Sequence, residues 1–348
     1  MKIFIACILF LASLTSYAQK IEIGAIEIIY SEILQEEREY WIYLPEHYSD
    51  EKYKEQEYPI IYLLDGEKYF HVVSGIVNNF SSGYYPIMPE CIVVAIKNTN
   101  RARDLTPTTM ADMGYESGGS SKFEYFITKE LMAKINGTYR TMDYKILMGH
   151  SFGGLFTMNA LFKKANSFNA YVAIDPSLWW DDALFVKGLG DKLHWLDFDK
   201  RTLFLANANS LGYPKKAGKQ DNAHFKAKEM AIKKMNANIP KNLNLNIKTY
   251  PEEDHGSVVL PSIIDAFRFI FKGYRANAKE VMKNPALLRT HYQEVSDKLG
   301  FDFKPQCAYI DGIVDLLIER HQLEKAEILH HLNMDLYPTN KYLQEKFD

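Results

Sequence analysis

An apolar run that leads into a Gly-x-Ser-x-Gly motif is the feature that most constrains this chain. Residues 146–154 read Ile-Leu-Met-Gly-His-Ser-Phe-Gly-Gly, and a helix-like segment follows at residues 155–164. Glycines flank the serine because a sharp turn from strand to helix leaves room only for small neighbours. Such a turn lifts the hydroxyl of Ser151 above the sheet, at a helix N-terminus that favours negative charge. The sequence therefore predicts a nucleophile elbow with Ser151 as the nucleophile.

Strand-like and helix-like segments alternate on both sides of the elbow. Two alternating stretches within residues 20–44 predict an antiparallel pair at a sheet edge. The later apolar runs are continuous, which suits strands buried on both faces of a parallel sheet. Short connections between these segments imply an α/β fold with the elbow near its centre, in the order of the α/β hydrolases. The predicted strands are residues 59–66, 90–96, 144–149, 170–174, 202–206 and 245–250, and the predicted helices are residues 68–80, 121–136, 155–164, 223–236 and 260–271.

Both ends of the chain depart from this pattern. Lys2, a short apolar run and the small residues Ser16 and Ala18 predict a secretory signal peptide over residues 1–18. The apolar run is too short to span a bilayer, so we expect a protein exported to the periplasm or beyond. Residues 19–274 are then the α/β-hydrolase domain. The last segment, residues 275–348, has no strand-like run, and its amphipathic pattern predicts a small helical appendage that offers a surface for a protein partner.

Composition excludes several classes of function. The formal net charge is −3 with both signs interspersed, so we expect no nucleic-acid partner. Beyond the signal peptide no apolar run is long enough for a membrane span. Two cysteines remain in the mature chain, Cys91 and Cys307, and their spacing indicates neither a disulfide framework nor a zinc site.

A serine nucleophile needs a general base, and in this fold the acid and then the histidine follow the serine along the chain. His255 follows the last predicted strand, and Gly256 beside it allows a tight loop, so His255 is the candidate base. After the strand at residues 202–206 the next carboxylate is Asp221, our first candidate for the acid. Asp175, after the preceding strand, is the second candidate. A serine–histidine dyad with a neutral orienting group is the third interpretation.

The oxyanion hole requires two hydrogen-bond donors. One candidate is the backbone N–H of Phe152, directly after the nucleophile, and the other is that of Gly66 or Glu67, in the turn after an earlier strand. Side chains at the carboxyl edge of the sheet are candidates for the substrate cleft, because ligands bind at that edge. These are His150, with a structural role as the alternative, Trp179 and Trp180, with ordinary packing as the alternative, and Arg101 and Arg103, which suit a carboxylate or phenolate.

Several motifs together resemble the putative-esterase branch of the α/β hydrolases. That branch includes siderophore esterases, feruloyl and acetyl-xylan esterases and S-formylglutathione hydrolase. The resemblance implies a cofactor-independent, metal-free hydrolase of a small-molecule or oligomeric ester, with Ser151 as nucleophile and His255 as base. The sequence departs from many relatives in lacking an acid directly after residue 206. The matching segments are residues 62–66, 100–107, 120–123, 149–154, 176–180 and 253–257.

The C-terminal segment has a resemblance of its own. Residues 309–342 look like a degenerate tetratricopeptide unit, as some bacterial members of the branch carry. The predicted signal peptide argues against the cytosolic S-formylglutathione hydrolases. Two other functions stay open, which are an acyltransferase that uses the same acyl-enzyme and a non-catalytic binding protein whose tail recruits a partner.

Overall fold

A single mixed β-sheet organises the chain. The computed structural model describes residues 21–163, 167–209, 219–240 and 242–346, so the predicted signal peptide at residues 1–18 lies outside the described residues. Eight described strands follow the order β1-β2-β4-β3-β5-β6-β7-β8. They are β1 (Ala25–Ser31), β2 (Glu36–Tyr43), β3 (Tyr58–Leu63), β4 (Ile92–Ile96), β5 (Thr141–His150), β6 (Ala170–Ile174), β7 (Arg201–Ala208) and β8 (Leu243–Tyr250).

Strand directions confirm the predicted fold class. β1 and β2 form the expected antiparallel pair at one edge, and β2 is also antiparallel to β4. Every pairing from β4 to β8 is parallel. The strand that ends at the elbow, β5, lies inside the sheet between β3 and β6. This is the α/β-hydrolase fold, in which the carboxyl ends of the central strands meet at one edge.

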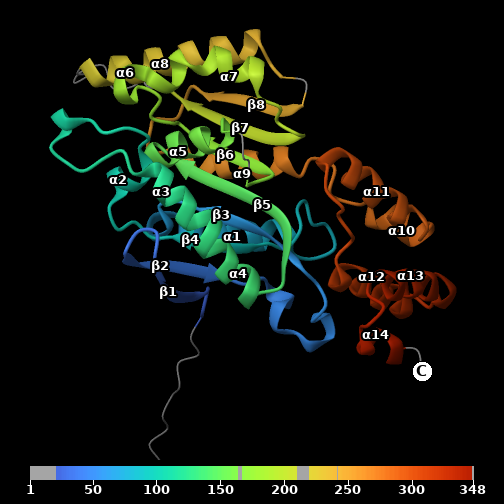
Figure 1. Ribbon diagram of the computed structural model, residues 1–348. Coiled ribbons are helices and arrows are strands. Elements are labelled where there is room, and N and C mark those ends of the chain that lie inside the picture. Colours follow the sequence, from blue (N-terminus) through green and yellow to red (C-terminus); the bar gives the residue numbers. More distant parts are fainter. Residues whose placement is uncertain (1–20, 164–166, 210–218, 241, 347–348) are drawn as a thin grey trace, which may run out of the picture.

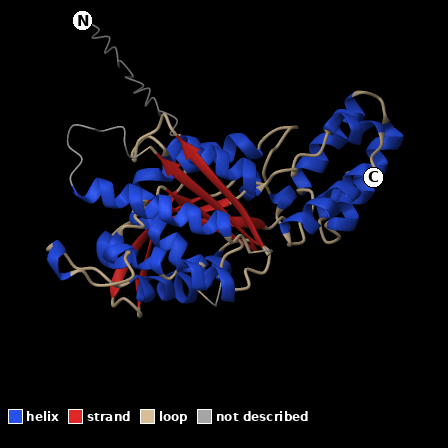
Figure 2. Cartoon of the chain, turned by 90° about the horizontal axis from the view of Figure 1, so that it is seen from above, coloured by secondary structure: helices blue, strands red, loops and turns tan. Residues whose placement is uncertain are grey.

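Helices cover both faces of the sheet, as Figures 1 and 2 show. Those before the elbow are α1 (Gly66–Ser81), α2 (Arg101–Leu105), α3 (Ser120–Tyr125) and α4 (Met132–Thr138), with one π-helical turn at Phe126–Leu131 between the last two. Those after it are α5 (Phe152–Leu161), α6 (Trp180–Lys187), α7 (Leu189–Trp195), α8 (Lys219–Ala237) and α9 (Val259–Ile270). The sequence pattern did not predict α6 and α7, because Gly188 and Gly190 interrupt the apolar period there.

Alternate side chains of the central strands serve the two faces. In β3, Ile61 and Leu63 belong to the buried cluster beneath α1 and α9. Ile60 and Tyr62 belong to the opposite cluster, beneath α3, α4, α5 and α8. Because successive residues of a strand point to opposite faces, a strand covered on both sides has to be apolar throughout. The continuous apolar runs of the sequence are the consequence.

The chain after Tyr274 is helical, as predicted, and extends to one side of the sheet (Figure 1). Its apolar side chains share a buried cluster with α1 and α9. Tyr53 O–H donates to Asp311 Oδ2 at 2.7 Å, which ties the extension to the loop before β3. Among the described residues, no helix is both long and apolar enough to cross a membrane. The helices are α10 (Ala278–Lys283), α11 (Leu287–Leu299), α12 (Cys307–Glu319), α13 (Leu323–Leu336) and α14 (Lys341–Glu345).

Candidate active site

Close backbone approaches build the elbow around Ser151. A Cβ atom on Gly149 would lie 2.4 Å from the backbone of Gly153, and one on Gly154 would lie 3.0 Å from Pro176. Ser151 has a φ of 61°, in the left-handed region, and directly precedes α5. Such a conformation is costly for a residue with a side chain and persists only where its surroundings enforce it. Here the tight packing of the glycines holds the serine at the N-terminus of α5.

Ser151, His255 and Asp175 form a continuous hydrogen-bonded line. His255 Nε2 lies 3.1 Å from Ser151 Oγ, and His255 Nδ1 lies 2.6 Å from Asp175 Oδ2. The serine follows β5, the aspartate follows β6 and the histidine lies in the loop after β8, so all three meet at the carboxyl edge of the sheet. The side chain of Asp175 is fully buried, whereas that of His255 is 46% exposed. A ligand can therefore reach the histidine while the carboxylate stays shielded from water.

Of the sequence candidates for the acid, Asp175 is the one that contacts His255. It was the second candidate, on the ground that it directly follows a strand of the parallel sheet. The first candidate, Asp221, belongs to α8, and its side chain lies outside the described residues. The geometry therefore favours a line of three residues over a serine–histidine dyad, because a carboxylate lies beside His255 Nδ1.

Asp175 accepts more hydrogen bonds than the one from His255. Lys228 Nζ lies 2.5 Å from Asp175 Oδ1, and His224 Nε2 lies 3.1 Å from Oδ2. The backbone N–H of Ala208 also donates to Oδ1, at 2.9 Å. Burial on its own would raise the pKa of Asp175, but the bonds from His224 and His255 and the charge of Lys228 hold that pKa well below its usual range. The carboxylate is thus ionised and fully paired.

Asp175, His224 and His255 are also the kind of side chains that bind metals, and their ligand atoms lie within 4.8 Å of one another. Ligands of a tetrahedral zinc ion, each about 2.0 to 2.1 Å from the metal, lie about 3.3 Å apart. The 2.6 Å between Asp175 Oδ2 and His255 Nδ1 is a hydrogen-bond distance instead. Lys228 also places a positive charge on the same carboxylate. The donor set fits a hydrogen-bonded cluster better than a metal site.

His150, the variable residue of the elbow, is buried and contacts the loop that carries His255. Its Nε2 lies 2.7 Å from the backbone oxygen of His255, and its Nδ1 lies 3.0 Å from Tyr69 Oη. A carbonyl can only accept, so Nε2–H donates to His255 and Nδ1 accepts from the Tyr69 hydroxyl. Burial, together with the charge of His255, lowers the pKa of His150 to about 4, which suits this neutral tautomer. His150 thus holds the His255 loop rather than lining the cleft.

The predicted oxyanion donors lie at two helix starts. Phe152 is the first residue of α5, and Gly66 and Glu67 begin α1. Amides in the first turn of a helix have no acceptor within the helix, so they are free to bind an oxyanion. Arg101 joins the two starts: its guanidinium contacts Asp65, the residue before α1, at 2.5 Å and the backbone oxygen of His150 at 3.2 Å. The positive charge of Arg101 is therefore paired with the carboxylate of Asp65.

The other predicted cleft residues differ in burial and in their partners. Trp180 is buried and donates to Thr108, whereas Trp179 is half-buried beside the ring of Phe152, at 6.3 Å between ring centroids. Arg103 contacts the carboxylates of Glu36 and Asp104, so its charge is paired away from Ser151.

Sequence reasoning missed four side chains that surround the catalytic line. Tyr69, His224 and Lys228 lie on predicted helices and Ser177 lies in the matching segment at residues 176–180, but no local pattern marks any of the four as functional. Ser177 is the nearest to the nucleophile, with 3.1 Å between its Oγ and that of Ser151. The only signal for any of them is position, since Ser177 lies two residues beyond Asp175 at the carboxyl edge. The four are Tyr69, Ser177, His224 and Lys228.

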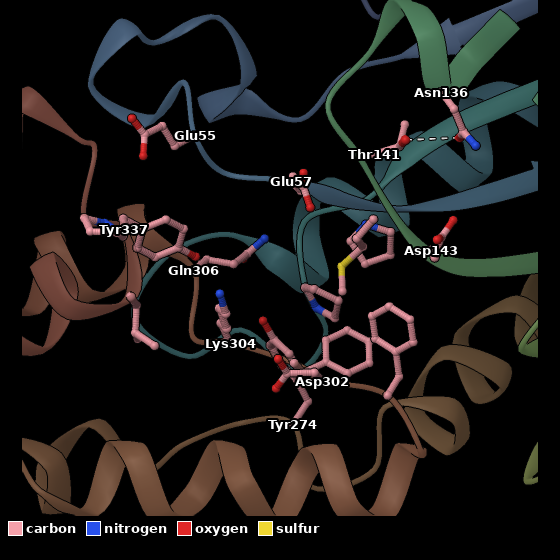
Figure 3. A pocket seen from close by; sticks show the side chains of 17 residues that line it. Glu55, Glu57, Asn136, Thr141, Asp143, Tyr274, Asp302, Lys304, Gln306 and Tyr337 are labelled. Atoms are coloured by element: carbon pink, nitrogen blue, oxygen red, sulfur yellow. Dashed lines mark hydrogen bonds between the residues drawn. The ribbon is translucent and has the colours of Figure 1, made fainter. Parts of the chain in front are cut away.

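A cavity of about 750 Å³ lies elsewhere, between the sheet and the C-terminal helices (Figure 3). Residues at the starts of β3 and β5 line it together with residues of the extension, and parallel strands start at the edge opposite to the one where they end. The carboxylates of Glu55, Glu57 and Asp302 surround it, and Figure 3 shows Gln306 pointing into it. None of the three residues of the catalytic line takes part in its lining.

A serine on a strand–helix elbow, with a histidine and a buried aspartate in line behind it, defines the protein as an α/β hydrolase. A family model described as putative esterase matches residues 31–253, which is more than half of the chain. The chain therefore belongs to this family of carboxylic-ester hydrolases.

Relatives of known structure or sequence agree with this placement. An IroE-like serine hydrolase from Shewanella oneidensis has 32% sequence identity and a TM-score of 0.80, and the match covers 90% of this chain and 99% of that one. A siderophore enterobactin esterase from Emericella nidulans is 26% identical over an alignment of 252 residues, and the match covers 60% of this chain and 81% of that protein. A siderophore triacetylfusarinine C esterase from Aspergillus fumigatus is 31% identical over an alignment of 155 residues, and the match covers 39% of this chain and only 50% of that protein.

Proposed function

We propose that this protein is an exported serine esterase that acts through an acyl-enzyme on Ser151. The observation that carries the proposal is the hydrogen-bonded line from Ser151 through His255 to Asp175. A hydroxyl is a weak nucleophile unless a base beside it takes its proton, and the base works best when a third group fixes its tautomer. Each of the three groups stands at the distance that its role requires.

The reaction follows from the positions of the protons. Ser151 Oγ attacks the ester carbonyl while its proton passes to His255 Nε2, and Asp175 accepts the Nδ1–H bond that orients the ring. His255 then gives the proton to the alcohol oxygen as its bond to the carbonyl carbon breaks. The acyl group stays on Ser151 as an ester. A water molecule, deprotonated by His255, attacks this ester, and the second tetrahedral intermediate releases the acid and restores the serine.

Charge on the tetrahedral intermediates falls on the former carbonyl oxygen. We assign its stabilisation to the N–H of Phe152 and that of Gly66 or Glu67, since both stand in first turns of helices. Arg101 supports both donors, because it joins Asp65 to the backbone of His150. The two helix starts are thus fixed relative to each other before a substrate arrives.

For the substrate we propose an ester bond of a siderophore or of a related oligomeric ester. The names of the Emericella and Aspergillus relatives support this class. The half-buried Trp179 beside Phe152 offers an apolar wall to an aromatic or acyl group, and the exposed side of His255 leaves room for a bulky ester. Export rests on the signal-peptide pattern of residues 1–18.

Labelling with a serine-directed fluorophosphonate tests the mechanism. Wild-type protein should be labelled at one site and should hydrolyse p-nitrophenyl butyrate, and Ser151→Ala should lose both. Ser121→Ala, at an exposed position in α3, is the control and should keep both. Equal labelling of the Ser151→Ala protein would refute the assignment of the nucleophile.

Product analysis tests the substrate class and the alternatives. We expect hydrolysis of enterobactin or triacetylfusarinine C to fragments that carry a free acid and a free alcohol. With an added alcohol acceptor, transfer of the acyl group in preference to hydrolysis would indicate an acyltransferase. A stable complex that survives in Ser151→Ala, with no turnover of any ester, would indicate a binding protein.

A further inference from the structure

Asp175, the acid of the hydrogen-bonded line, forms an ion pair with Lys228 on the side away from His255. Lys228 Nζ contacts Asp175 Oδ1 at 2.5 Å, on the oxygen that does not face His255, and also donates to the backbone oxygen of Ala208 at 3.1 Å. Lys228 is only 2% exposed and Asp175 is fully buried. A salt bridge this deep exerts a strong field on neighbouring charges, because little water is present to screen it.

This arrangement changes what the acid does for the histidine. In a serine–histidine–acid line the carboxylate stabilises the imidazolium that forms when the histidine takes the proton. Here a lysine offsets much of the negative charge before the imidazolium forms. The carboxylate keeps its orienting role, since its Oδ2 still accepts the bond from His255 at 2.6 Å, but its electrostatic pull on the imidazolium is weaker.

We propose that Lys228 is a positioning residue that sets the acid limit of catalysis: by pairing with Asp175 it keeps His255 neutral, and therefore active as a base, at lower pH. The inference rests on the proposed function. It adds a residue from α8, outside the elbow and the histidine loop, to the groups that control the reaction.

The other titratable groups around Asp175 and His255 do not place a positive charge on Asp175 as Lys228 does. From α8, His224 also contacts Asp175 Oδ2, but burial lowers the pKa of His224, which disfavours its charged form. From β5, His150 lies 4.5 Å from His255 between ring centroids, and its pKa is lowered to about 4, so it is neutral. Glu229, the next residue of α8, is an acidic neighbour of Lys228. Among these described groups, Lys228 is the cation in direct contact with Asp175.

The test is the pH dependence of kcat/KM for p-nitrophenyl butyrate in wild type and in Lys228→Gln. Glutamine keeps a hydrogen-bond donor for Asp175 and removes the charge. Without the charge Asp175 stabilises the imidazolium more strongly, so the acid limb should move to higher pH by about one unit or more. Lys228→Arg keeps the charge and should leave the limb near its wild-type position. Lys234→Met removes a charge from the same helix at a site that contacts backbone oxygens, and it should also leave the limb in place.

Two outcomes would overturn the proposal. In the first, Lys228→Gln lowers kcat but leaves the acid limb where it is, which would reduce Lys228 to packing. In the second, Lys228→Arg moves the limb as far as Lys228→Gln does, so that the charge is irrelevant. If Lys228→Gln does not fold, Lys228→Met, a neutral side chain of similar length, takes its place.

A readout independent of turnover separates this inference from the proposed esterase function. The imidazole ring protons of His255 can be followed by NMR during a pH titration and assigned from their absence in His255→Gln. An upward shift of this titration in Lys228→Gln, in a protein that cleaves no ester, would support the role of Lys228 and refute the esterase function alone. An active esterase whose His255 titration is the same with and without Lys228 would refute the role of Lys228 alone.

Discussion

The two edges of the sheet are built by different means. At the carboxyl edge, three neighbouring strands each lead to a non-glycine residue with positive φ: Asp65 after β3, Ser151 after β5 and Asp175 after β6. Two of these residues carry buried carboxylates that are paired with cations, Asp65 with Arg101 and Asp175 with Lys228. At the amino edge, the strands start beside a wide cavity, and the C-terminal helices are attached there mainly by apolar packing.

The comparison shows where this fold accepts a cost in stability. A left-handed non-glycine residue costs about 1 to 3 kcal/mol, and a buried ion pair gains little or nothing over apolar packing. Both kinds of cost meet in one residue at the edge that holds the candidate chemistry, since Asp175 has a positive φ and forms a buried ion pair with Lys228. The extension also contains a residue with positive φ, His321, and an ion pair of Lys346 with the buried Asp311, but neither adjoins the candidate chemistry. Changes at the carboxyl edge should therefore alter activity first, and changes at the extension should alter stability first.

The largest expected effect is at Ser151, and a pair of variants there separates activity from strain. Both Ser151→Ala and Ser151→Gly should lower kcat/KM by about a thousandfold or more. Glycine adopts a φ of 61° freely, so Ser151→Gly should also be more stable than Ser151→Ala by about 1 kcal/mol. Urea unfolding of the two variants measures the difference. Equal stability would mean that the elbow is not strained.

The second effect is at Asp175, where activity and stability should fall together. Asp175→Asn should lower kcat by about a hundredfold to ten-thousandfold, because His255 loses the acceptor that fixes its tautomer. It also removes the carboxylate that Lys228 contacts at 2.5 Å in a buried site, at a cost of up to about 3 kcal/mol. Removing both charges in Asp175→Asn/Lys228→Met should restore stability but not activity. Asp221→Asn is the matched control, and a similar loss of kcat in that variant would return the acid to the first sequence candidate.

The fold, the nucleophile and the base could be predicted from the sequence because each depends on a local pattern. The strand–helix alternation and the glycines around Ser151 are patterns within a few residues, and His255 is recognisable beside Gly256 after the last strand. The acid depends on tertiary geometry instead. Asp175 and Asp221 both follow the nucleophile in the chain, and the approach of the His255 loop to the end of β6 is what brings Asp175 into contact with the base.

The supporting groups were beyond the reach of the sequence for the same reason. Lys228 has the pattern of a helix-surface lysine, and it is buried because α8 packs its Ala227 and Ala231 on the sheet beside Asp175. His150 was interpreted as structural or cleft-lining, and its contact with the backbone of His255 joins residues 105 apart in sequence. The paired tryptophans likewise differ only in the folded chain, where Trp180 is buried and Trp179 is half-buried.

A third prediction concerns pH and His150. Because burial lowers the pKa of His150 to about 4 from an ordinary value of about 6.5, the unfolded chain binds a proton over this range that the folded chain excludes. Stability should therefore fall as the pH is lowered from about 6.5 to 4, by up to about 3 kcal/mol from this group. His150→Gln retains a donor for the His255 carbonyl and does not titrate, so its loss of stability over the same range should be smaller. The measurement is the free energy of unfolding of wild type and His150→Gln at each pH. Equal losses of stability in the two proteins would mean that His150 is not the cause.

The smallest effect is expected at the extension, and it completes the comparison from the other side. Tyr53→Phe removes the hydroxyl that donates to Asp311, so the free energy of unfolding should fall by about 1 kcal/mol. Asp311 keeps contacts with Tyr342 and Lys346, which limits the loss. kcat and KM for p-nitrophenyl butyrate should stay unchanged, because Tyr53 lies near the amino edge and Ser151 lies at the carboxyl edge. A change in KM without a change in stability would instead connect the extension to substrate binding, and the division between the two edges would then no longer hold.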